Sequence, residues 1–160
     1  MNINEEDLFV LAEEEMKTFE PQLRELISNN YNKPFTLEHR IKSLENLQRK
    51  QLLWKQRKGY LPRISQLPDI IGYRIAVDDE ADCELIANII SSFLKPQGLI
   101  DYFHIPRETG FKAFLYYLEN GKINTEIQVM STQMKDWTNA THEEHENLKY
   151  ASVNEQHKTK

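Results

Sequence analysis

The chain has few cysteines and glycines and no long apolar run. Its single cysteine, Cys83, excludes an internal disulfide and a cysteine-based zinc site, and it is typical of a reducing compartment. Its five glycines do not make a Walker or Rossmann phosphate-binding loop. No apolar run approaches the roughly 18 residues of a membrane span, and the acidic N-terminus lacks the apolar stretch of a secretory signal. We therefore expect a cytoplasmic protein without membrane contact.

The composition fits one folded domain. A length of 160 residues is enough for one core but not for two independent ones. Hydrophobic residues make up 39% and charged residues 28% of the chain, a balance that excludes overall disorder. We divide the chain into an N-terminal helical segment (residues 1–33), a main domain (34–150) and a C-terminal tail (151–160).

Charge is distributed unevenly along the chain. The formal net charge is −5, yet residues 40–63 hold eight basic residues and one acid. A basic block of this density in an acidic protein favours a polyanionic partner, such as the phosphates of a nucleotide or of RNA. A solvated helix face without a partner gives the same pattern, so the block alone leaves both interpretations open.

Periodicity predicts both helices and strands. Apolar residues at helical spacing indicate a helix that Pro21 is expected to kink or split, and a second helix for which Ser43 is a suitable N-cap. An Asn120-Gly121 pair between two apolar runs indicates a β-hairpin. The expected helices are 4–28, 44–57, 79–95 and 132–150, and the expected strands are 35–41, 70–77, 99–103, 111–118 and 124–130. This order predicts an α+β fold, a mixed β-sheet of about five strands flanked by helices.

Two carboxylates differ from the other acids by their position. Asp69 immediately precedes the expected strand 70–77, and Glu126 lies inside the strand 124–130, where alternation places it on the same face as Gln128. An acid on a central strand is costly unless it is paired, bound to a metal or exposed in a cleft. Two such carboxylates beside a basic block would suit Mg²⁺ and phosphates. The alternative is that Asp69 only ends a loop and that Glu126 faces solvent on an edge strand.

Four segments within residues 38–150 resemble sequence motifs of one family. Arg40–Lys50 resembles R-x-K-S-x-x-S-x-x-x-K, and Asp69–Ile75 resembles D-[LI]-x-G-x-R-[IV]. Asp101–Phe111 resembles D-Y-I-x-x-P-x-x-x-G-Y, and Thr125–Gln128 resembles [VE]-E-[IV]-Q. In this order the segments resemble the synthetase domain of the RelA/SpoT family, which includes the small alarmone synthetases. They include both carboxylates and much of the basic block.

The resemblance implies a fold, a reaction and a set of site residues. The fold would be nucleotidyltransferase-like, and the β,γ-pyrophosphate of ATP would move to the ribose 3′-hydroxyl of GDP or GTP. The catalytic residues would be Asp69 and Glu126, both holding the cofactor Mg²⁺, with Glu126 also taking the proton of the 3′-hydroxyl. The ATP-binding residues would be Arg40 and Arg74 on adenine, Lys42 and Lys50 on the triphosphate, and Ser43 and Asn46 beside them. The acceptor-binding residues would be Phe111, Lys112 and Gln128.

The acceptor side departs from the family pattern. Phe111 replaces a tyrosine and keeps only its stacking ring, Leu115 replaces a histidine, and Met130 replaces a basic residue. On the ATP side, Asn46 replaces a serine and can still hydrogen-bond a phosphate. Two alternatives therefore stay open: a toxin-like relative that pyrophosphorylates the 3′ end of tRNA, and a degenerate domain that binds nucleotide and regulates a partner. Some family members form oligomers, so a homo-oligomer is a further expectation.

Overall fold

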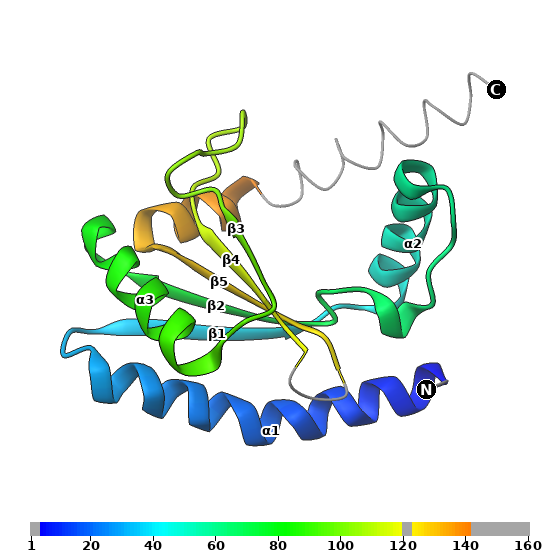
Figure 1. The fold of residues 1–160 in the computed structure, drawn as a ribbon, viewed down its shortest axis with the longest axis horizontal. Helices are drawn as coiled ribbons and strands as arrows, with labels where there is room; N and C mark the ends of the chain where they lie inside the picture. The colour runs from blue at the N-terminus through cyan, green and yellow to red at the C-terminus, as the bar shows by residue number, and fades with distance from the viewer. Residues whose placement is uncertain (1–3, 120–122, 142–160) are drawn as a thin grey trace.

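Five strands form one mixed sheet (Figure 1). The structure is a computed structural model and describes residues 4–119 and 123–141. The strands are β1 (Phe35–Ile41), β2 (Ile71–Val77), β3 (Gly98–Asp101), β4 (Phe114–Leu118) and β5 (Thr125–Ser131). They lie in the order β1-β2-β5-β4-β3, with β2 and β5 parallel and the other neighbours antiparallel. The predicted α+β fold with a mixed sheet is confirmed.

Two helices cover one face of the sheet. α1 (Glu5–Asn30) runs along this face, and α3 (Cys83–Leu94) packs beside it (Figure 1). Strand alternation turns every second residue of β2 and β5 toward these helices, where they form the main core. Among them, Tyr73, Ile75, Ile127 and Val129 are at most 2% exposed. The residues between them face the opposite side of the sheet, which we call the open face.

α1 is one helix through Pro21, so the split considered above does not occur. The side chain of Asn4 caps the first turn by accepting a hydrogen bond of 2.8 Å from the amide of Asp7. Leu8 before the proline and Ile27 after it are both buried in the core. Packing on both sides of Pro21 offsets the backbone hydrogen bond that proline removes.

α2 (Leu44–Lys58) stands at one end of the sheet (Figure 1). Ser43 caps its start by accepting a hydrogen bond of 3.2 Å from the amide of Asn46, and Gly59 ends it in a left-handed conformation with φ of 82°. These ends agree with the predicted helix to within one residue. The amide of Lys42 donates to the carbonyl of Ile70 at 2.9 Å, which ties the chain entering α2 to the start of β2.

The helix predicted over 79–95 requires correction. It begins as a separate 3₁₀ turn, η2 (Glu80–Asp82), and becomes α3 only at Cys83. The Asp79 carboxylate accepts a hydrogen bond of 3.0 Å from the amide of Ala81, and this short-range cap favours the tighter turn. At the other end Lys95 has a φ of 48°, so the α-helix stops at Leu94.

The strand predicted over 111–118 begins only at Phe114. Residues 111–113 belong instead to a loop, 102–113, that closes on itself. The amide of Arg107 donates to the carbonyl of Phe111 at 3.0 Å, and the amide of Gly110 donates to the carbonyl of Arg107 at 2.8 Å. Gly110 has a φ of 93°, which glycine adopts without steric cost. The turn therefore uses the carbonyl of Phe111, which in a strand would pair with a neighbouring strand.

The strand predicted over 99–103 also ends early. The Asp101 carboxylate accepts hydrogen bonds from the amides of Phe103 at 2.9 Å and His104 at 2.8 Å, which turns the chain out of the sheet. The two hairpin strands, β4 and β5, pair as predicted, but the turn at Asn120-Gly121 lies outside the described residues.

The last predicted helix is described only over residues 132–141. The rest of it, 142–150, and the tail 151–160 lie outside the described residues. In the part of the chain that the structure covers, no helix combines the length and the apolar character needed to cross a membrane.

Candidate functional site

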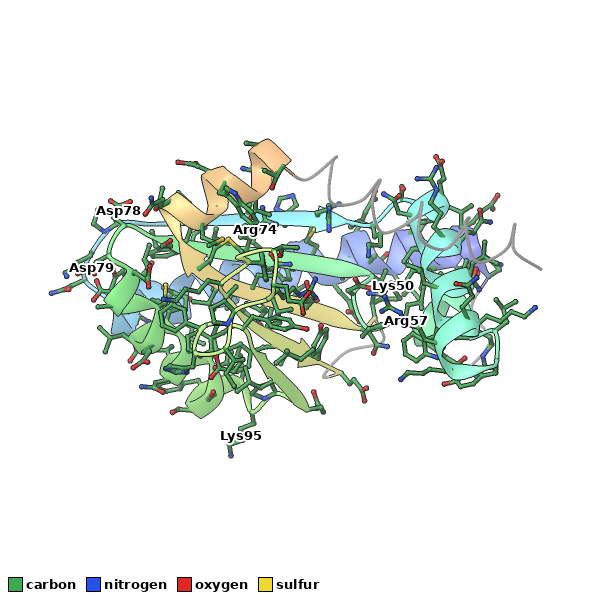
Figure 2. All side chains as sticks on the ribbon, turned by 90° about the horizontal axis from the view of Figure 1, so that it is seen from above. Lys50, Arg57, Arg74, Asp78, Asp79 and Lys95 are labelled. Carbon is green, nitrogen blue, oxygen red and sulfur yellow. The ribbon has the colours of Figure 1, made fainter. Side chains whose placement is uncertain are left out.

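The open face of β1, β2 and β5 contains a pocket of about 310 Å³. Arg40 of β1, Arg74 of β2, and Glu126 and Gln128 of β5 line it. All four alternate with core residues along their strands, which is why they reach the same face. Figure 2 views the sheet from this side and shows Arg74 lying across it. The pocket brings together four of the residues that the sequence singled out.

Arg74 is held on both sides within this pocket. Its Nε donates to Oε1 of Gln128 at 3.0 Å, and its Nη1 donates to Oδ1 of Asn139 at 3.0 Å. Burial, and then the positive charge of Arg40, lower the pKa of Arg74. Two guanidinium groups in one pocket repel each other, and each can stack on a flat aromatic ring. An aromatic, anionic ligand would relieve the repulsion and use both planes.

Asp69 forms an ion-pair cluster with two lysines at the start of β2. Its Oδ2 accepts hydrogen bonds from Nζ of Lys42 at 2.8 Å and from Nζ of Lys50 at 2.6 Å. Burial alone would raise the pKa of Asp69, but the charges of Lys50 and Lys42 outweigh it and lower the pKa to about 2. Among the described residues, the buried Oδ1 of Asp69 has no hydrogen-bond partner. Figure 2 shows Lys50 extending from α2 toward the sheet.

Glu126 lies on a central strand, between β2 and β4. Gly72, three residues after Asp69, is its partner across the parallel pair, so both carboxylates belong to the same end of the sheet. Oε1 of Glu126 accepts a hydrogen bond of 2.9 Å from Nε2 of Gln128, and the Tyr117 hydroxyl donates to the same carboxylate. Burial, and then the charges of Glu126 and Asp69, raise the pKa of Tyr117. The alternative that placed Glu126 on an edge strand is wrong.

The other two residues expected to bind ATP lie on the first turn of α2. The Ser43 hydroxyl is occupied as the helix cap, where it accepts from the Asn46 amide. The half-buried Asn46 lies four residues before Lys50, so the two side chains share one face of the helix. A phosphate bound by Lys50 would therefore lie within reach of Asn46.

Two of the three expected acceptor residues lie in the loop 102–113 and do not line the Arg40–Arg74 pocket. The Phe111 ring meets the Tyr102 ring edge-on, with centroids 6.2 Å apart. Lys112 forms an ion pair with Glu80 of η2. Only Gln128 of the expected acceptor set lines the pocket.

An apolar cluster occupies the open face next to this loop. It consists of Ala76, Ala113, Leu115 and Met130, each at most 4% exposed. Leu115 and Met130 are the residues that depart from the family pattern. A charged side chain at either position would lose its hydration in this cluster, so the apolar residues match the packing that surrounds them.

Sequence reasoning did not single out three polar residues of the site. Tyr117 could have been found, because it alternates with the core residues Tyr116 and Leu118 and is therefore on the face of Glu126, its partner across the hairpin. Asn139 could not, since 65 positions separate it from Arg74 and only the folded chain brings them together. Glu38 is the third, an exposed acid that lines the pocket from β1.

The open face offers oxygen ligands that suit Mg²⁺. Within residues 4–119 and 123–141, no group of three or more His, Cys, Asp or Glu side chains could hold a metal ion. Mg²⁺ does not require such a group, because it takes one or two protein carboxylates and completes its octahedron with water and phosphate oxygens. The Oδ1 of Asp69, which has no hydrogen-bond partner among the described residues, and the carboxylate of Glu126 are oxygen atoms that would suit such a role.

The fold and the site together define a class of protein. It has a mixed sheet with two arginines and a carboxylate on one open face, and a basic helix at one end of that sheet. Comparison with known families agrees with this class of protein. The family model described as a region found in RelA / SpoT proteins matches residues 39–153. The chain belongs to the RelA/SpoT family.

Solved structures of similar fold include two small alarmone synthetases from Bacillus subtilis. Small alarmone synthetase 2 has a TM-score of 0.68 and 20% identity, covering 91% of this chain and 87% of that one. Small alarmone synthetase 1, bound to its product pppGpp, has a TM-score of 0.69 and 20% identity over 91% and 80%. A GTP pyrophosphokinase family protein from Streptococcus pneumoniae has a TM-score of 0.70 and 23% identity over 96% and 81%. No curated protein sequence matches the chain.

Proposed function

We propose that this chain transfers the β,γ-pyrophosphate of ATP to the 3′-hydroxyl of GDP or GTP. The observation that carries the proposal is the position of three features at one end of the sheet. These are the Arg40–Arg74 pocket, the Glu126 carboxylate in its wall, and the Lys42–Lys50–Asp69 cluster beside it. Membership of the RelA/SpoT family supports the same reaction class.

ATP would bind with adenine between the guanidinium planes of Arg40 and Arg74. Its phosphates would extend toward Lys42 and Lys50, where two positive charges face the single negative charge of Asp69. The cluster therefore keeps a positive charge in excess for the phosphates. Positioning and charge stabilisation are the main contributions that a protein makes to such transfers.

The acceptor hydroxyl would lie beside Glu126. The reaction forms a bond between the 3′-oxygen and the β-phosphorus of ATP and breaks the bond from that phosphorus to the bridging oxygen, which leaves with AMP. Glu126 would accept the proton of the hydroxyl, and Tyr117 and Gln128, which donate to its carboxylate, would orient it. When bound by Asp69 and Glu126, Mg²⁺ would screen the negative charge of the phosphates.

The groups available to an acceptor differ from those that would bind ATP. The Phe111 ring offers a stacking surface at the edge of the apolar cluster, and Gln128 offers an amide inside the pocket. Lys112 would have to leave Glu80 to meet an acceptor phosphate. We therefore assign the guanine nucleotide to the side of the open face that contains the loop 102–113.

A transfer assay tests the proposal directly. The protein is incubated with Mg²⁺, ATP labelled at the γ-phosphate and one acceptor at a time: GDP, GTP, ATP or deacylated tRNA. We expect label to appear on GDP or GTP together with release of AMP. Label on tRNA alone would replace the proposal with the toxin-like alternative. ATP binding without transfer to any acceptor would favour the degenerate regulatory domain.

A further inference from the structure

Asn139 lies in the wall of the Arg40–Arg74 pocket, and its side chain binds one of the two arginines. It belongs to the helix at residues 132–141, on the side of the sheet opposite α1 (Figure 1). Its Oδ1 accepts a hydrogen bond of 3.0 Å from Nη1 of Arg74. Asn139 is exposed, and no described residue accepts a hydrogen bond from its Nδ2. The amide therefore offers a ligand an accessible hydrogen-bond donor beside an oxygen atom.

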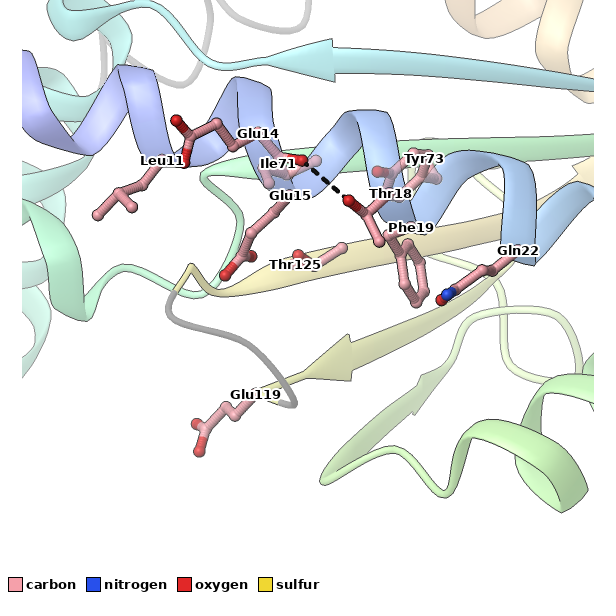
Figure 3. Close-up of a pocket in the computed structure, with 10 residues that line it drawn as sticks. All are labelled: Leu11, Glu14, Glu15, Thr18, Phe19, Gln22, Ile71, Tyr73, Glu119 and Thr125. Carbon is pink, nitrogen blue, oxygen red and sulfur yellow. Dashed lines mark hydrogen bonds between the residues drawn. The ribbon is translucent and has the colours of Figure 1, made fainter.

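A larger cavity, of about 580 Å³, lies between α1 and the sheet, on the face opposite this pocket (Figure 3). Its described lining residues include Glu14, Glu15 and Glu119 but no lysine or arginine. The phosphates of a nucleotide would meet no described positive charge there. Recognition of a nucleotide base is therefore expected in the Arg40–Arg74 pocket, to which Asn139 belongs.

The hydrogen bond from Arg74 determines which way the Asn139 amide faces. A guanidinium group donates hydrogen bonds and accepts none, so it requires the amide oxygen. If the amide turned over, Nδ2 would face Nη1 and two donors would oppose each other. On its other side Arg74 is held in the same way, since its Nε donates to Oε1 of Gln128 at 3.0 Å. The order of the oxygen and the nitrogen of Asn139 is therefore fixed within the pocket.

The helix that carries Asn139 contacts the pocket at the end remote from the lysine cluster. Lys135, one turn before Asn139, forms an ion pair of 2.7 Å with Glu38 of β1. Glu38 is the partner of Arg74 across the antiparallel pair, and the chain reaches Lys42 only four residues later, after β1 ends. A nucleotide with its phosphates on the lysine cluster and its base at Arg74 would thus present the base to Asn139.

The two purines differ in the groups that such an amide would meet. Adenine has an amino group next to a ring nitrogen, a donor beside an acceptor, and the oxygen and the nitrogen of one asparagine amide can bind both. Guanine has a carbonyl oxygen in place of that amino group, and this oxygen would face Oδ1 of Asn139. Two acceptors in contact repel each other, and the bond from Arg74 prevents the amide from turning over.

We propose that Asn139 recognises the amino group of adenine and selects ATP over GTP as the pyrophosphate donor, an inference that rests on the function proposed above. The selection would matter for that reaction because GTP, as an acceptor, has the same triphosphate as ATP and differs from it only in the base. Arg40 and Arg74 can stack on either purine, so stacking alone does not distinguish them. Asn139 would be the residue that does.

Competition for the ATP-binding pocket tests the inference without any transfer. A radiolabelled non-hydrolysable ATP analogue is bound with Mg²⁺ and displaced by the unlabelled ATP or GTP analogue, so that GTP bound elsewhere does not contribute. We expect the wild type to need about tenfold more of the GTP analogue or above. In Asn139→Ala and Asn139→Asp this ratio should fall to about threefold or less. The controls Gln133→Ala and Gln133→Glu alter an exposed residue of the same helix outside the pocket and should keep the wild-type ratio.

Asn139→Asp separates recognition of the base from support of Arg74. The aspartate keeps an oxygen acceptor for Arg74 but has no donor for the ring nitrogen, and its charge affects both nucleotides alike. A wild-type ratio in this variant would show that Asn139 only positions Arg74 and would overturn the proposal. An inosine triphosphate analogue, which has the carbonyl but lacks the second amino group of guanine, should displace as weakly as the GTP analogue. Displacement as strong as that by ATP would likewise overturn it.

The outcomes also distinguish this inference from the proposed reaction. Equal displacement of the label by the ATP and GTP analogues in the wild type would overturn the role of Asn139, whether or not pyrophosphate is transferred. A clear preference for the ATP analogue without transfer to GDP or GTP would overturn the proposed reaction and leave the role of Asn139 intact. No binding of the labelled analogue would overturn both.

Discussion

Lys50 on α2 and Asp69 before β2 form an ion pair of 2.6 Å, although 19 positions separate them in the chain. The pair joins the basic helix to the strand that carries Arg74 and, together with the Lys42–Ile70 backbone hydrogen bond, ties α2 to the start of β2. Lys42 donates to the same oxygen of Asp69 at 2.8 Å. Two ammonium groups thus converge on one carboxylate, and both lie where an incoming triphosphate could compete for them.

Asp69 should make the protein sensitive to acid. Its pKa of about 2 in the folded state is below the usual 3.8, so its stabilisation is present above about pH 4 and is lost as the pH falls from about 4 to 2. The shift corresponds to a contribution on the order of 2 kcal/mol at neutral pH. Urea unfolding at several pH values should show a smaller acid-induced loss in Asp69→Asn than in the wild type. The exposed Asp136→Asn is the control, and an equal loss in all three proteins would contradict the prediction.

Lys50→Ala should weaken ATP binding by about 1–3 kcal/mol, the range for a hydrogen bond to a charged group. Lys55→Ala, an exposed lysine on the same helix, should have little effect and serves as the matched control. Binding is measured by calorimetry with a non-hydrolysable ATP analogue and Mg²⁺. If Lys42→Ala and Lys50→Ala both bind the analogue as tightly as the wild type, the phosphates do not lie on this cluster.

Most of the sheet could be predicted from the sequence because its strands carry strong local signals. β1 matches its prediction at both ends, and the alternation of Glu126 and Gln128 with Ile127 and Val129 correctly placed the first two on the open face. Arg74, which the sequence singled out only through the family resemblance, follows the same alternation in the structure and lies opposite the core. These features depend on a period of two along a strand, which the sequence shows directly.

The loop 102–113 could not be predicted in the same way. The apolar run from Phe111 to Leu118 reads as one strand, but a backbone turn at Gly110 and an ion pair between Lys112 and Glu80 hold its first residues outside the sheet. The contact of Lys42 and Lys50 with Asp69 also could not be predicted from local sequence patterns. The sequence singled out the three residues, but only tertiary structure shows that they bind one another.

Because of His104, the folding stability of the protein should decrease at alkaline pH. Its Nδ1 lies 2.6 Å from Oδ2 of Asp101 and its Nε2 lies 2.5 Å from Oε1 of Glu84, and these hydrogen bonds raise the pKa of His104. A raised pKa means stabilisation that is complete below about pH 6.5 and is lost as the pH rises through the folded-state value. Urea midpoints between about pH 6 and about pH 9 should therefore fall more steeply in the wild type than in His104→Asn. Glu84→Gln should show an intermediate slope, and equal slopes in all three proteins would exclude this role of His104.

Glu126→Gln should separate binding from catalysis. The substitution keeps the shape of the side chain and its place beside Arg74, but an amide cannot accept the proton of a 3′-hydroxyl. ATP affinity should stay close to that of the wild type, whereas AMP release with GDP or GTP should fall by roughly a hundredfold or more. Glu25→Gln, on the exposed side of α1, controls for the loss of one charge. The rate of AMP release and the affinity for ATP are measured on the same preparations, and full activity in Glu126→Gln would show that another group takes the proton.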